Sequence, residues 1–471
     1  MKNKTVNTGY MVFLAVVAAI GGILFGYDTA VISGTTKAVR TQFGLSVMQQ
    51  GWYVGCALIG SIFGVLTAGV MSDNLGRKKT MLIASVLFSI SAIGCCLCKG
   101  FTDLVVFRII GGIGIGIVSI VSPMYISEVS VAEKRGTMVS LYQLAITVGF
   151  VAAYFINYFI LADVPGPAAA AFGQKIFHTE YWRGMLGFET LPDLLFLIVI
   201  FFIPESPRWL MVKGRNDEAM NILNRIYTDP EEALKQKEAT LSSLRTEVKG
   251  DWHALFEPGI FGAVIIGSSI AILGQFMGVN AVLYYGPSIL EQAGFGGEES
   301  LLSQSLVGVV NMLTTVIALL IIDKVGRKKL IYWGVSGMII CLLAIAMYFK
   351  FGESLGLGNS FVLIFFLLYI FCQAISISAV VFVILSEMYP NNVRGLAMSI
   401  AGLALWLGTY LIGQLTPWML ENLSPAGTFL LFAAMCIPYM LIFWKMIPET
   451  TGKSLEEIES YWRTKGSRKK K

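Results

Sequence analysis

Twelve long apolar runs alternate with short polar segments along this chain. Each run approaches the ~20 residues that a helix needs to cross ~30 Å of hydrocarbon. Because a backbone in lipid must satisfy its own hydrogen bonds, unbroken runs of this length are predicted to be helices. The first run is too long for a cleavable signal peptide and is predicted to remain as the first span. The predicted spans lie near residues 10–34, 48–71, 80–98, 103–125, 138–160, 184–203, 258–290, 302–322, 330–349, 361–386, 396–420 and 426–447.

The composition also indicates a chain embedded in lipid. Of its 471 residues, 55% are hydrophobic and 14% are charged, whereas a soluble domain carries about 25% charged residues. The predicted fold class is therefore all-α integral membrane, with the lipid bilayer as its solvent. The seven cysteines fall within or at the ends of apolar runs. We interpret them as small hydrophobic side chains and expect neither disulfides nor a metal site.

Lysine and arginine are concentrated in particular loops, and this explains the net charge of +5 without nucleic-acid binding. The segments 291–301 and 421–426 contain no Lys or Arg. The positive-inside rule therefore predicts that both termini and the long central segment are cytoplasmic. The basic segments are 73–79, 132–136, 204–256, 323–329 and the C-terminal tail.

Three motifs occur twice in the same order, which indicates an internal duplication. GVMSDNLGRKK ending at residue 79 recurs as LLIIDKVGRKK ending at 329, SEVSVAEKRG as SEMYPNNVRG, and PESPRWL as PETTGKSLEE. Two six-helix halves joined by a cytoplasmic linker are the simplest explanation. The predicted boundaries are 1–204 for the first half, 205–256 for a linker with short amphipathic helices, 257–447 for the second half and 448–471 for a basic tail.

The repeated motifs place acidic and basic side chains at the cytoplasmic helix ends. Glu128 and Arg135 are seven residues apart, as are Glu387 and Arg394, and each pair is predicted to bridge neighbouring loops. Ion pairs between the halves would hold one face closed and release when the halves rock; charges that merely set topology are the alternative. The predicted gating residues are Asp73, Arg77, Glu128, Arg135, Glu205, Arg208, Asp323, Arg327, Glu387, Arg394 and Glu449.

Together with GYDTAVISG at 26–34, the stretch 108–136 and GQFMGVNAVLYYGPSIL at 274–290, these motifs extend over essentially the whole chain. On these residues the chain resembles the sugar porter family of the major facilitator superfamily, and within it the bacterial sugar–proton symporters of the xylose type. The resemblance implies alternating access to a substrate site near the membrane midplane. A monomer in the bacterial inner membrane is expected, with a monosaccharide and a proton as ligands and without a cofactor.

Asp28, Arg108 and Glu189 are predicted to lie at one depth inside the membrane. Asp28 and Arg108 are each six residues from the outer end of a span, roughly 9 Å at ~1.5 Å per residue, and Glu189 falls near that level. A buried carboxylate takes up a proton or pairs with a cation, so Asp28 is predicted to be the proton carrier and Arg108 its partner. The resemblance implies the same, because related porters with aspartate there are proton-coupled.

The same charges also allow alternative roles. A static buried ion pair is the alternative for Asp28 and Arg108. Glu189 resembles an acid of related symporters that would tune this pair. Asp193 lies one turn further along and replaces a residue that is usually small in the family. We expect its carboxyl to bond backbone groups freed by Pro192, with a second protonation site as the alternative.

Sugar sites need amides, which donate and accept hydrogen bonds, and aromatic platforms for the apolar face of the ring. The glycines within 274–286 predict a broken helix whose backbone is open to a ligand. The resemblance adds further positions, and helix–helix contacts are the alternative for any single member. The predicted sugar-binding residues are Gln143, Gln275, Asn280, Tyr284, Asn311, Phe382 and Trp406.

The chain departs from the xylose-type pattern at several of these positions. Gly274, Leu405 and Phe150 stand where glutamines occur in related porters, and Phe382 replaces a tryptophan. The predicted pocket has fewer amides, so the sequence leaves open which pentose or hexose is bound.

A facilitator, a nutrient receptor and an exporter of a less polar polyol-like or drug-like solute are the competing functions. Asp28 with Arg108 argues against a facilitator, and the short tail argues against a receptor. The reduced number of amides keeps the exporter open. The sequence contains no Walker-type phosphate loop and no catalytic triad, so neither an ATP-driven pump nor an enzyme is expected.

Overall fold

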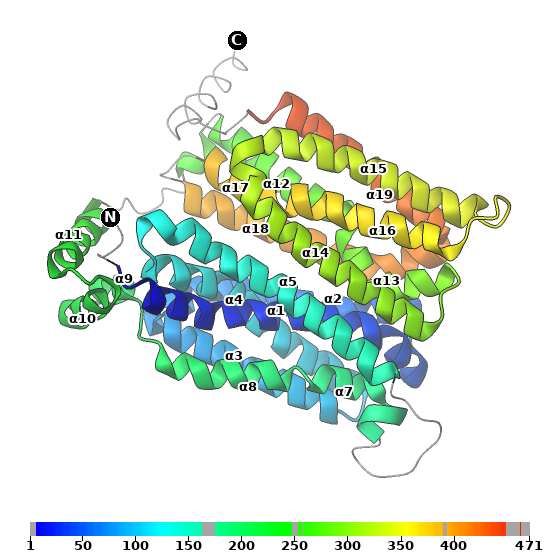
Figure 1. Cartoon of the computed structure of the whole chain (residues 1–471), viewed down its shortest axis with the longest axis horizontal. Coiled ribbons are helices and arrows are strands. Elements are labelled where there is room, and N and C mark those ends of the chain that lie inside the picture. Colours follow the sequence, from blue (N-terminus) through cyan, green and yellow to red (C-terminus); the bar gives the residue numbers. More distant parts are fainter. Residues whose placement is uncertain are drawn as a thin grey trace. The chain divides into compact units, whose positions relative to one another are not determined.

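The computed structural model describes residues 6–162, 175–246, 253–257, 259–389, 393–448 and Trp462. In this part of the chain twelve helical segments are long and apolar enough to cross a membrane, which confirms the predicted spans and the all-helical fold. The helices are α1 Thr8–Phe43, α2 Val47–Leu75, α3 Arg77–Leu97, α4 Phe101–Val129, α5 Arg135–Ala162, α7 Tyr181–Gly187, α8 Thr190–Val199, α9 Pro207–Val212, α10 Asn216–Ile226, α11 Pro230–Thr246, α12 Ile260–Phe276, α13 Val279–Gln292, α14 Gly297–Val325, α15 Arg327–Phe351, α16 Asn359–Gln373, α17 Ala379–Met388, α18 Arg394–Asn422 and α19 Ser424–Lys445 (Figure 1).

One compact unit comprises Met1–Ile32 and Cys56–Glu247. Within it α4 packs closely against α2, because glycines in the stretch 108–136 face backbone carbonyls. A Cβ on Gly112 would lie 2.0 Å from the Ala57 oxygen, and one on Gly116 would lie 2.2 Å from the Ser61 oxygen. Small residues let membrane helices approach in this way, so this glycine-rich stretch serves helix packing.

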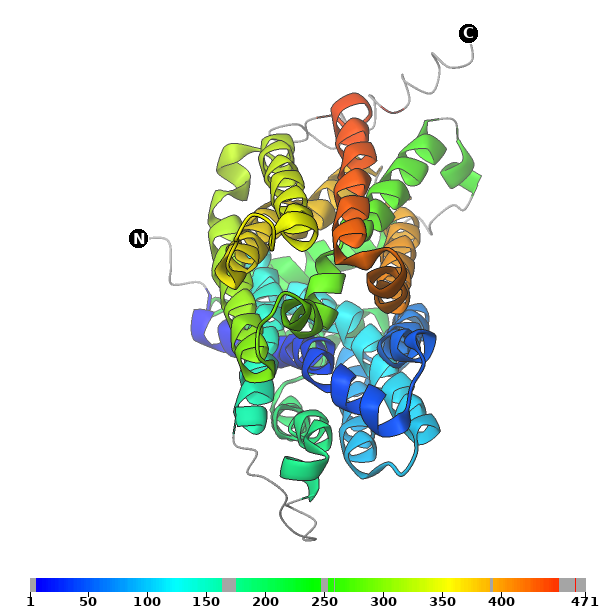
Figure 2. The same ribbon diagram turned by 90° about the vertical axis from the view of Figure 1, so that its right-hand side faces the viewer.

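The other compact unit comprises Ser33–Gly55 and Val248–Lys471. It therefore includes the end of α1 and the start of α2 as well as α12 to α19. Within it α12 packs against α18 and α19, and α15 packs against α16 and α19. In Figure 2, α15, α16 and α19 (yellow-green to red) form one group of neighbouring helices.

Three spans are interrupted by breaks in helical geometry. The sixth changes from α7 to α8 at Phe188 and Glu189, and the tenth contains a π-helical turn, Ala374–Ser378, between α16 and α17. The seventh breaks at Gly278, whose φ of 93° is left-handed. A Cβ there would lie 2.3 Å from Phe432, so only glycine fits this position. The broken helix predicted within 274–286 is confirmed.

Side chains supply hydrogen bonds that prolines remove from these helices. Pro417 cannot donate to the Gly413 carbonyl one turn earlier, and Tyr285 donates its hydroxyl to that oxygen at 2.7 Å. Pro287 likewise cannot donate to the Leu283 carbonyl. The buried Gln304 amide donates to that oxygen at 3.4 Å. These contacts satisfy backbone groups inside the membrane. They also fix α13 against α14 and α18.

Helices α9, α10 and α11 follow the first six spans and belong to the first unit. Ser206 caps α9 by accepting from the Trp209 amide at 3.3 Å. The Trp209 indole in turn donates to the Asp73 carbonyl at 2.9 Å, at the end of α2. The Asn7 amide donates to the Ile226 carbonyl at 2.8 Å and so attaches the start of the chain to α10. α9 and α10 are thus held against the ends of α2 and α1, respectively.

Candidate functional site

A buried ion pair lies inside the first unit. Asp28 on α1 is 1% exposed and Arg108 on α4 is 3% exposed, and Nη1 of Arg108 donates to Oδ1 of Asp28. The matched depths inferred from the sequence thus correspond to a direct contact. An ion pair taken out of water in this way has a large desolvation cost, so its presence inside a span is a signal of function.

Glu189 joins this pair at the break between α7 and α8, and it is 2% exposed. Its carboxyl lies beside Asp28, close enough for a side-chain hydrogen bond between the two. The Tyr27 hydroxyl donates to the Met185 carbonyl at 3.0 Å and holds α7 against α1. Two carboxylates and one guanidinium leave one net negative charge, so a single bound proton makes the cluster neutral. Because buried net charge is costly, this arrangement is suited to holding one proton.

Asp193 has different partners from those expected. Ser85 donates to one of its carboxyl oxygens at 2.9 Å, and Ser89 donates to the other. The expectation that Asp193 bonds backbone freed by Pro192 is therefore wrong, because two hydroxyls on α3 are nearer. The sequence contained a signal for these partners, because Ser85 and Ser89 are one helical turn apart and form one polar face of α3.

A cluster of amides lies at the break between α12 and α13 in the second unit. Oε1 of Gln275 accepts from Nδ2 of Asn280 at 2.7 Å and from the Thr409 hydroxyl at 3.2 Å. In an unbroken helix, residues five positions apart lie on different faces. The break at Gly278, between α12 and α13, brings Gln275 and Asn280 into contact. Thr409 was not predicted, although it lies one turn from Trp406 on α18. These three polar side chains offer donors and acceptors on one small patch.

The remaining predicted sugar-binding residues differ in burial. Tyr284, Asn311 and Trp406 are buried in the second unit, whereas Phe382 on α17 is 54% exposed. Gln143 is half-buried on α5 of the first unit. A common sugar site for these residues stays a prediction.

A second charged cluster lies at the C-terminal ends of α2 and α4 and at the N-terminal ends of α3 and α9. Arg77 donates from Nε and Nη2 to Glu128 at 2.9 and 3.0 Å, and from Nη1 to Asp73 at 3.3 Å. Ser206 donates to the same Glu128 carboxylate. Glu205 accepts from the backbone amides of Arg77 and its neighbour at 2.8 to 3.2 Å, capping α3. Burial nevertheless raises the pKa of Glu205 above its usual value.

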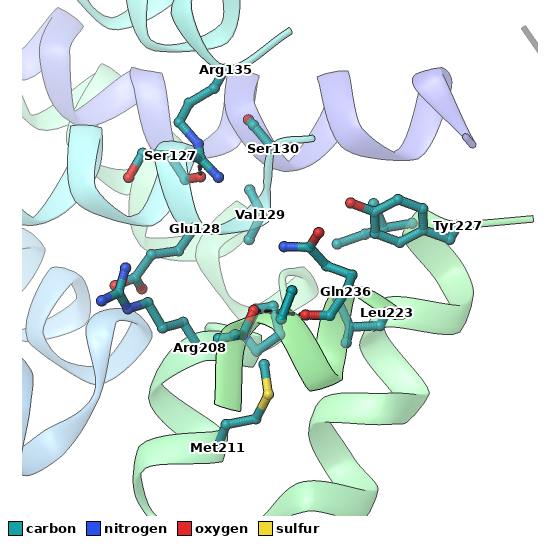
Figure 3. A pocket seen from close by; sticks show the side chains of 14 residues that line it. Ser127, Glu128, Val129, Ser130, Arg135, Arg208, Met211, Leu223, Tyr227 and Gln236 are labelled. Carbon is teal, nitrogen blue, oxygen red and sulfur yellow. Dashed lines mark hydrogen bonds between the residues drawn. The ribbon is translucent and has the colours of Figure 1, made fainter. Parts of the chain in front are cut away.

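The predicted bridge between Glu128 and Arg135 is wrong. Glu128 is bound by Arg77, whereas Arg135 donates from Nε to the Ser127 carbonyl at 3.1 Å. Spacing along one loop suggested Arg135 as the partner of Glu128. The ends of α3 and α4 instead bring Arg77, from the preceding motif, into contact with Glu128. Arg208 lies near Glu128, and the two side chains point toward one another in Figure 3.

The second unit repeats this arrangement. Arg327 donates to Glu387 at 3.1 Å, whereas Arg394 donates to the Tyr389 carbonyl at 3.3 Å. The predicted bridge between Glu387 and Arg394 is therefore also wrong. The ion pairs that these motifs form among the described residues each lie within one unit. Glu449 lies outside the described residues, and the Asp323 side chain is not described.

Among the described residues, no group of three or more His, Cys, Asp or Glu side chains could hold a metal ion. The site consists instead of buried charges, membrane amides and paired charges at helix ends. Together with twelve spans and duplicated motifs, these features define a multi-pass membrane transporter.

The comparisons with known proteins identify the family. The model described as "Sugar (and other) transporter" matches residues 14–462. The arabinose-proton symporter of Bacillus subtilis (strain 168) is 39% identical over 458 residues, covering 97% of this chain and 96% of that protein. The D-xylose-proton symporter of Escherichia coli (strain K12) is 36% identical over 492 residues, covering 98% and 97%. The inward-open structure of the E. coli xylose transporter XylE matches with a TM-score of 0.82 and 35% identity, over 96% of this chain and all of that one.

The chain belongs to the sugar porter family of the major facilitator superfamily. It is a multi-pass protein of the inner membrane, and its relatives are sugar transporters rather than enzymes.

Proposed function

We propose that this protein imports a monosaccharide, a pentose or a hexose, together with a proton by alternating access. The observation that carries the proposal is the buried cluster of Asp28, Arg108 and Glu189, whose charges balance when one proton is bound. The relatives named as arabinose–proton and xylose–proton symporters support the same function.

In this proposal Asp28 is the proton carrier. Without a proton, Asp28 binds Arg108 and holds α1 against α4. Protonation removes the charge of Asp28 and weakens that pair, and Glu189 remains as the counter-ion of Arg108. Arg108 thus exchanges one partner for another without becoming an isolated buried charge, which would cost several kcal/mol. This exchange allows α1 to move when the substrate site is occupied.

Sugar binding is assigned to the amide cluster and its neighbours. In the absence of sugar, Asn280 and Thr409 both donate to Gln275, so the buried groups are satisfied. A sugar hydroxyl inserted between them exchanges these bonds for bonds to the ligand, at small net cost. Tyr284, Asn311, Phe382, Trp406 and Gln143 complete the proposed site.

The termini and the helices α9 to α11 are assigned to the cytoplasm, and the protein is assigned as a monomer. In this orientation the pairs Arg77–Glu128 and Arg327–Glu387 lie at cytoplasmic helix ends, one in each unit. Each pair would stabilise its helix ends in one conformation and rearrange as transport proceeds.

Transport by purified protein in liposomes tests this function. With an inward proton gradient, the wild type should accumulate one sugar from a panel of pentoses, hexoses and polyols above its equilibrium level, with matching proton uptake. Asp28→Asn should still exchange labelled sugar but should neither accumulate it nor move protons. Asp103→Asn, at an exposed aspartate in the first turn of α4, is the matched control.

Undiminished accumulation by Asp28→Asn would refute the proton-carrier role. A wild type that equilibrates sugar but never concentrates it would identify a facilitator instead.

A further inference from the structure

A cavity of about 260 Å³ lies beside the charged cluster of the first unit, away from the buried ion pair. Its walls come from the α4–α5 turn on one side and from α9, α10 and α11 on the other (Figure 3). A water molecule occupies ~30 Å³ of liquid. The cavity is thus large enough for a small organic molecule, near the lower end of the range for ligand pockets.

Three polar side chains reach this cavity from different walls. Arg135 is held by its Nε bond to the Ser127 carbonyl, and its two terminal nitrogens have no hydrogen-bond partner among the described residues. The Gln236 amide and the Tyr227 hydroxyl also have no partner within the described ranges. All three line the cavity, with Arg135 from α5, Tyr227 after α10 and Gln236 from α11. One oriented cation and two hydrogen-bonding groups therefore face the same space.

The charges around the cavity favour an anion. Glu128 forms part of the wall, but Arg77 and Ser206 already bind its carboxylate. Arg208 adds a second guanidinium to the lining. Glu133 and Glu232 act on Tyr227 electrostatically but do not line the cavity. Arginine donors of this kind recognise phosphate and carboxylate oxygens through charge-assisted hydrogen bonds.

Ser127, Ser130 and Thr240 add hydroxyl-bearing residues to the lining, and another part of it is apolar, with Met211, Leu223 and Ile226 among the residues that form it. An inorganic anion would leave this surface uncovered, whereas a short carbon chain would cover it. We propose that the cavity binds the phosphate ester of a small polyol or sugar. The phosphate is held by Arg135, the hydroxyls by Gln236 and Tyr227, and the carbon skeleton by the apolar wall.

Two molecules present this chemistry: a soluble sugar or glycerol phosphate, and the glycerophosphate headgroup of an anionic lipid. Either would connect α5 to α10 and α11, next to the helix ends that carry the Arg77–Glu128 pair. If these ends rearrange during transport, as the proposed function requires, the bound ester slows transport. This last consequence rests on the proposed function, whereas binding itself does not.

Equilibrium titration of the full chain in neutral detergent tests the site. The probes are glycerol 3-phosphate and D-glucose 6-phosphate, with inorganic phosphate and glycerol as comparisons. Arg135→Gln should weaken binding of the two esters about tenfold or more, as expected for loss of a charged hydrogen-bond donor. Arg225→Gln removes the same charge from an exposed position of α10 that does not line the cavity, and it should bind like the wild type.

Gln236→Glu provides a second variant that keeps the side chain's shape but places a negative charge in the cavity. It should weaken ester binding while leaving sugar transport measured without esters unchanged. Nanodiscs with phosphatidylglycerol or phosphatidylcholine distinguish the sources. If the ligand is lipid, mass spectrometry should detect retained phosphatidylglycerol on the wild type and on Arg225→Gln, but not on Arg135→Gln.

The proposal is overturned if neither soluble ester nor phosphatidylglycerol binds, or if Arg135→Gln and Arg225→Gln weaken binding equally. If inorganic phosphate binds as tightly as the esters, the apolar wall contributes nothing to binding, and the assignment of a carbon-containing ligand is wrong. Because these measurements follow binding rather than flux, absence of symport would leave their outcome unaffected.

Discussion

Replacing Arg108 by glutamine isolates the role of charge balance in the buried cluster. Wild-type Asp28, Arg108 and Glu189 need one proton to be neutral. In Arg108→Gln two carboxyls remain without a cation, and both must be protonated before the cluster is neutral. In Asp28→Asn, by contrast, Arg108 and Glu189 balance each other with no proton bound. The two variants therefore change the number of bound protons in opposite directions.

The size of the effect follows from the cost of that additional proton. A carboxyl that ionises near pH 4 in water costs about 4 kcal/mol to keep protonated at pH 7. This agrees with the ~3–5 kcal/mol measured when one partner of a buried ion pair is removed. The folded variant binds one proton more than the folded wild type, so the stability difference between the two grows as pH rises, by up to about 1.4 kcal/mol per pH unit.

Unfolding in detergent, followed between pH 5 and pH 8, measures this effect. Arg108→Gln should unfold at a lower temperature than the wild type at pH 7 and should recover much of the difference at pH 5. Asp28→Asn is the matched comparison and should unfold at a temperature equal to or above that of the wild type at pH 7, because its cluster is neutral without a bound proton. Equal stability of Arg108→Gln and the wild type at every pH would show that the buried charges are not balanced in this way.

Two further predictions concern the amide cluster and the charged helix ends. Gln275→Ala removes the acceptor shared by Asn280 and Thr409. It should weaken sugar binding about tenfold or more, because buried polar groups are left unpaired. Counterflow of labelled sugar measures the affinity, and an unchanged affinity would exclude Gln275 from the site. Glu128→Gln removes the charge that Arg77 binds through two nitrogens. It should lower the free energy of unfolding by about 1–3 kcal/mol. A melting temperature equal to that of the wild type would contradict this prediction.

The charged motifs illustrate how spacing along the chain can mislead. Glu128 and Arg135 are close in sequence, but the turn between α4 and α5 directs Arg135 toward the Ser127 carbonyl. Arg77 comes from the preceding motif and reaches Glu128 with two nitrogens. In the second repeat, Arg327 of the earlier motif likewise pairs with Glu387. Because it occurs in both repeats, the pairing reflects the geometry of the helix ends.

Asp193 gives a second example. Its position one turn after Glu189 was evident, but its partners lie more than one hundred residues earlier in the chain, on α3. A carboxyl next to a proline can bond nearby backbone or a neighbouring helix, and the packing of α8 on α3 selects the second.

The sequence by itself determined the twelve helices, the duplication and the matched depths of Asp28 and Arg108. Spans follow from hydropathy, since lipid forces each apolar run to satisfy its own backbone. Depth follows from the constant rise of a helix, so two charges can be placed at one level before any packing is known. The break at Gly278 was also readable, because glycines gather there around amides.

The tertiary structure alone decided which side chains touch. Rotation of each helix about its axis is set by packing against its neighbours, and hydropathy leaves that rotation undetermined. This rotation places Thr409 on Gln275, Ser85 and Ser89 on Asp193, and Arg77 rather than Arg135 on Glu128. The cavity that Arg135 faces likewise exists only because α10 and α11 fold back beside α5.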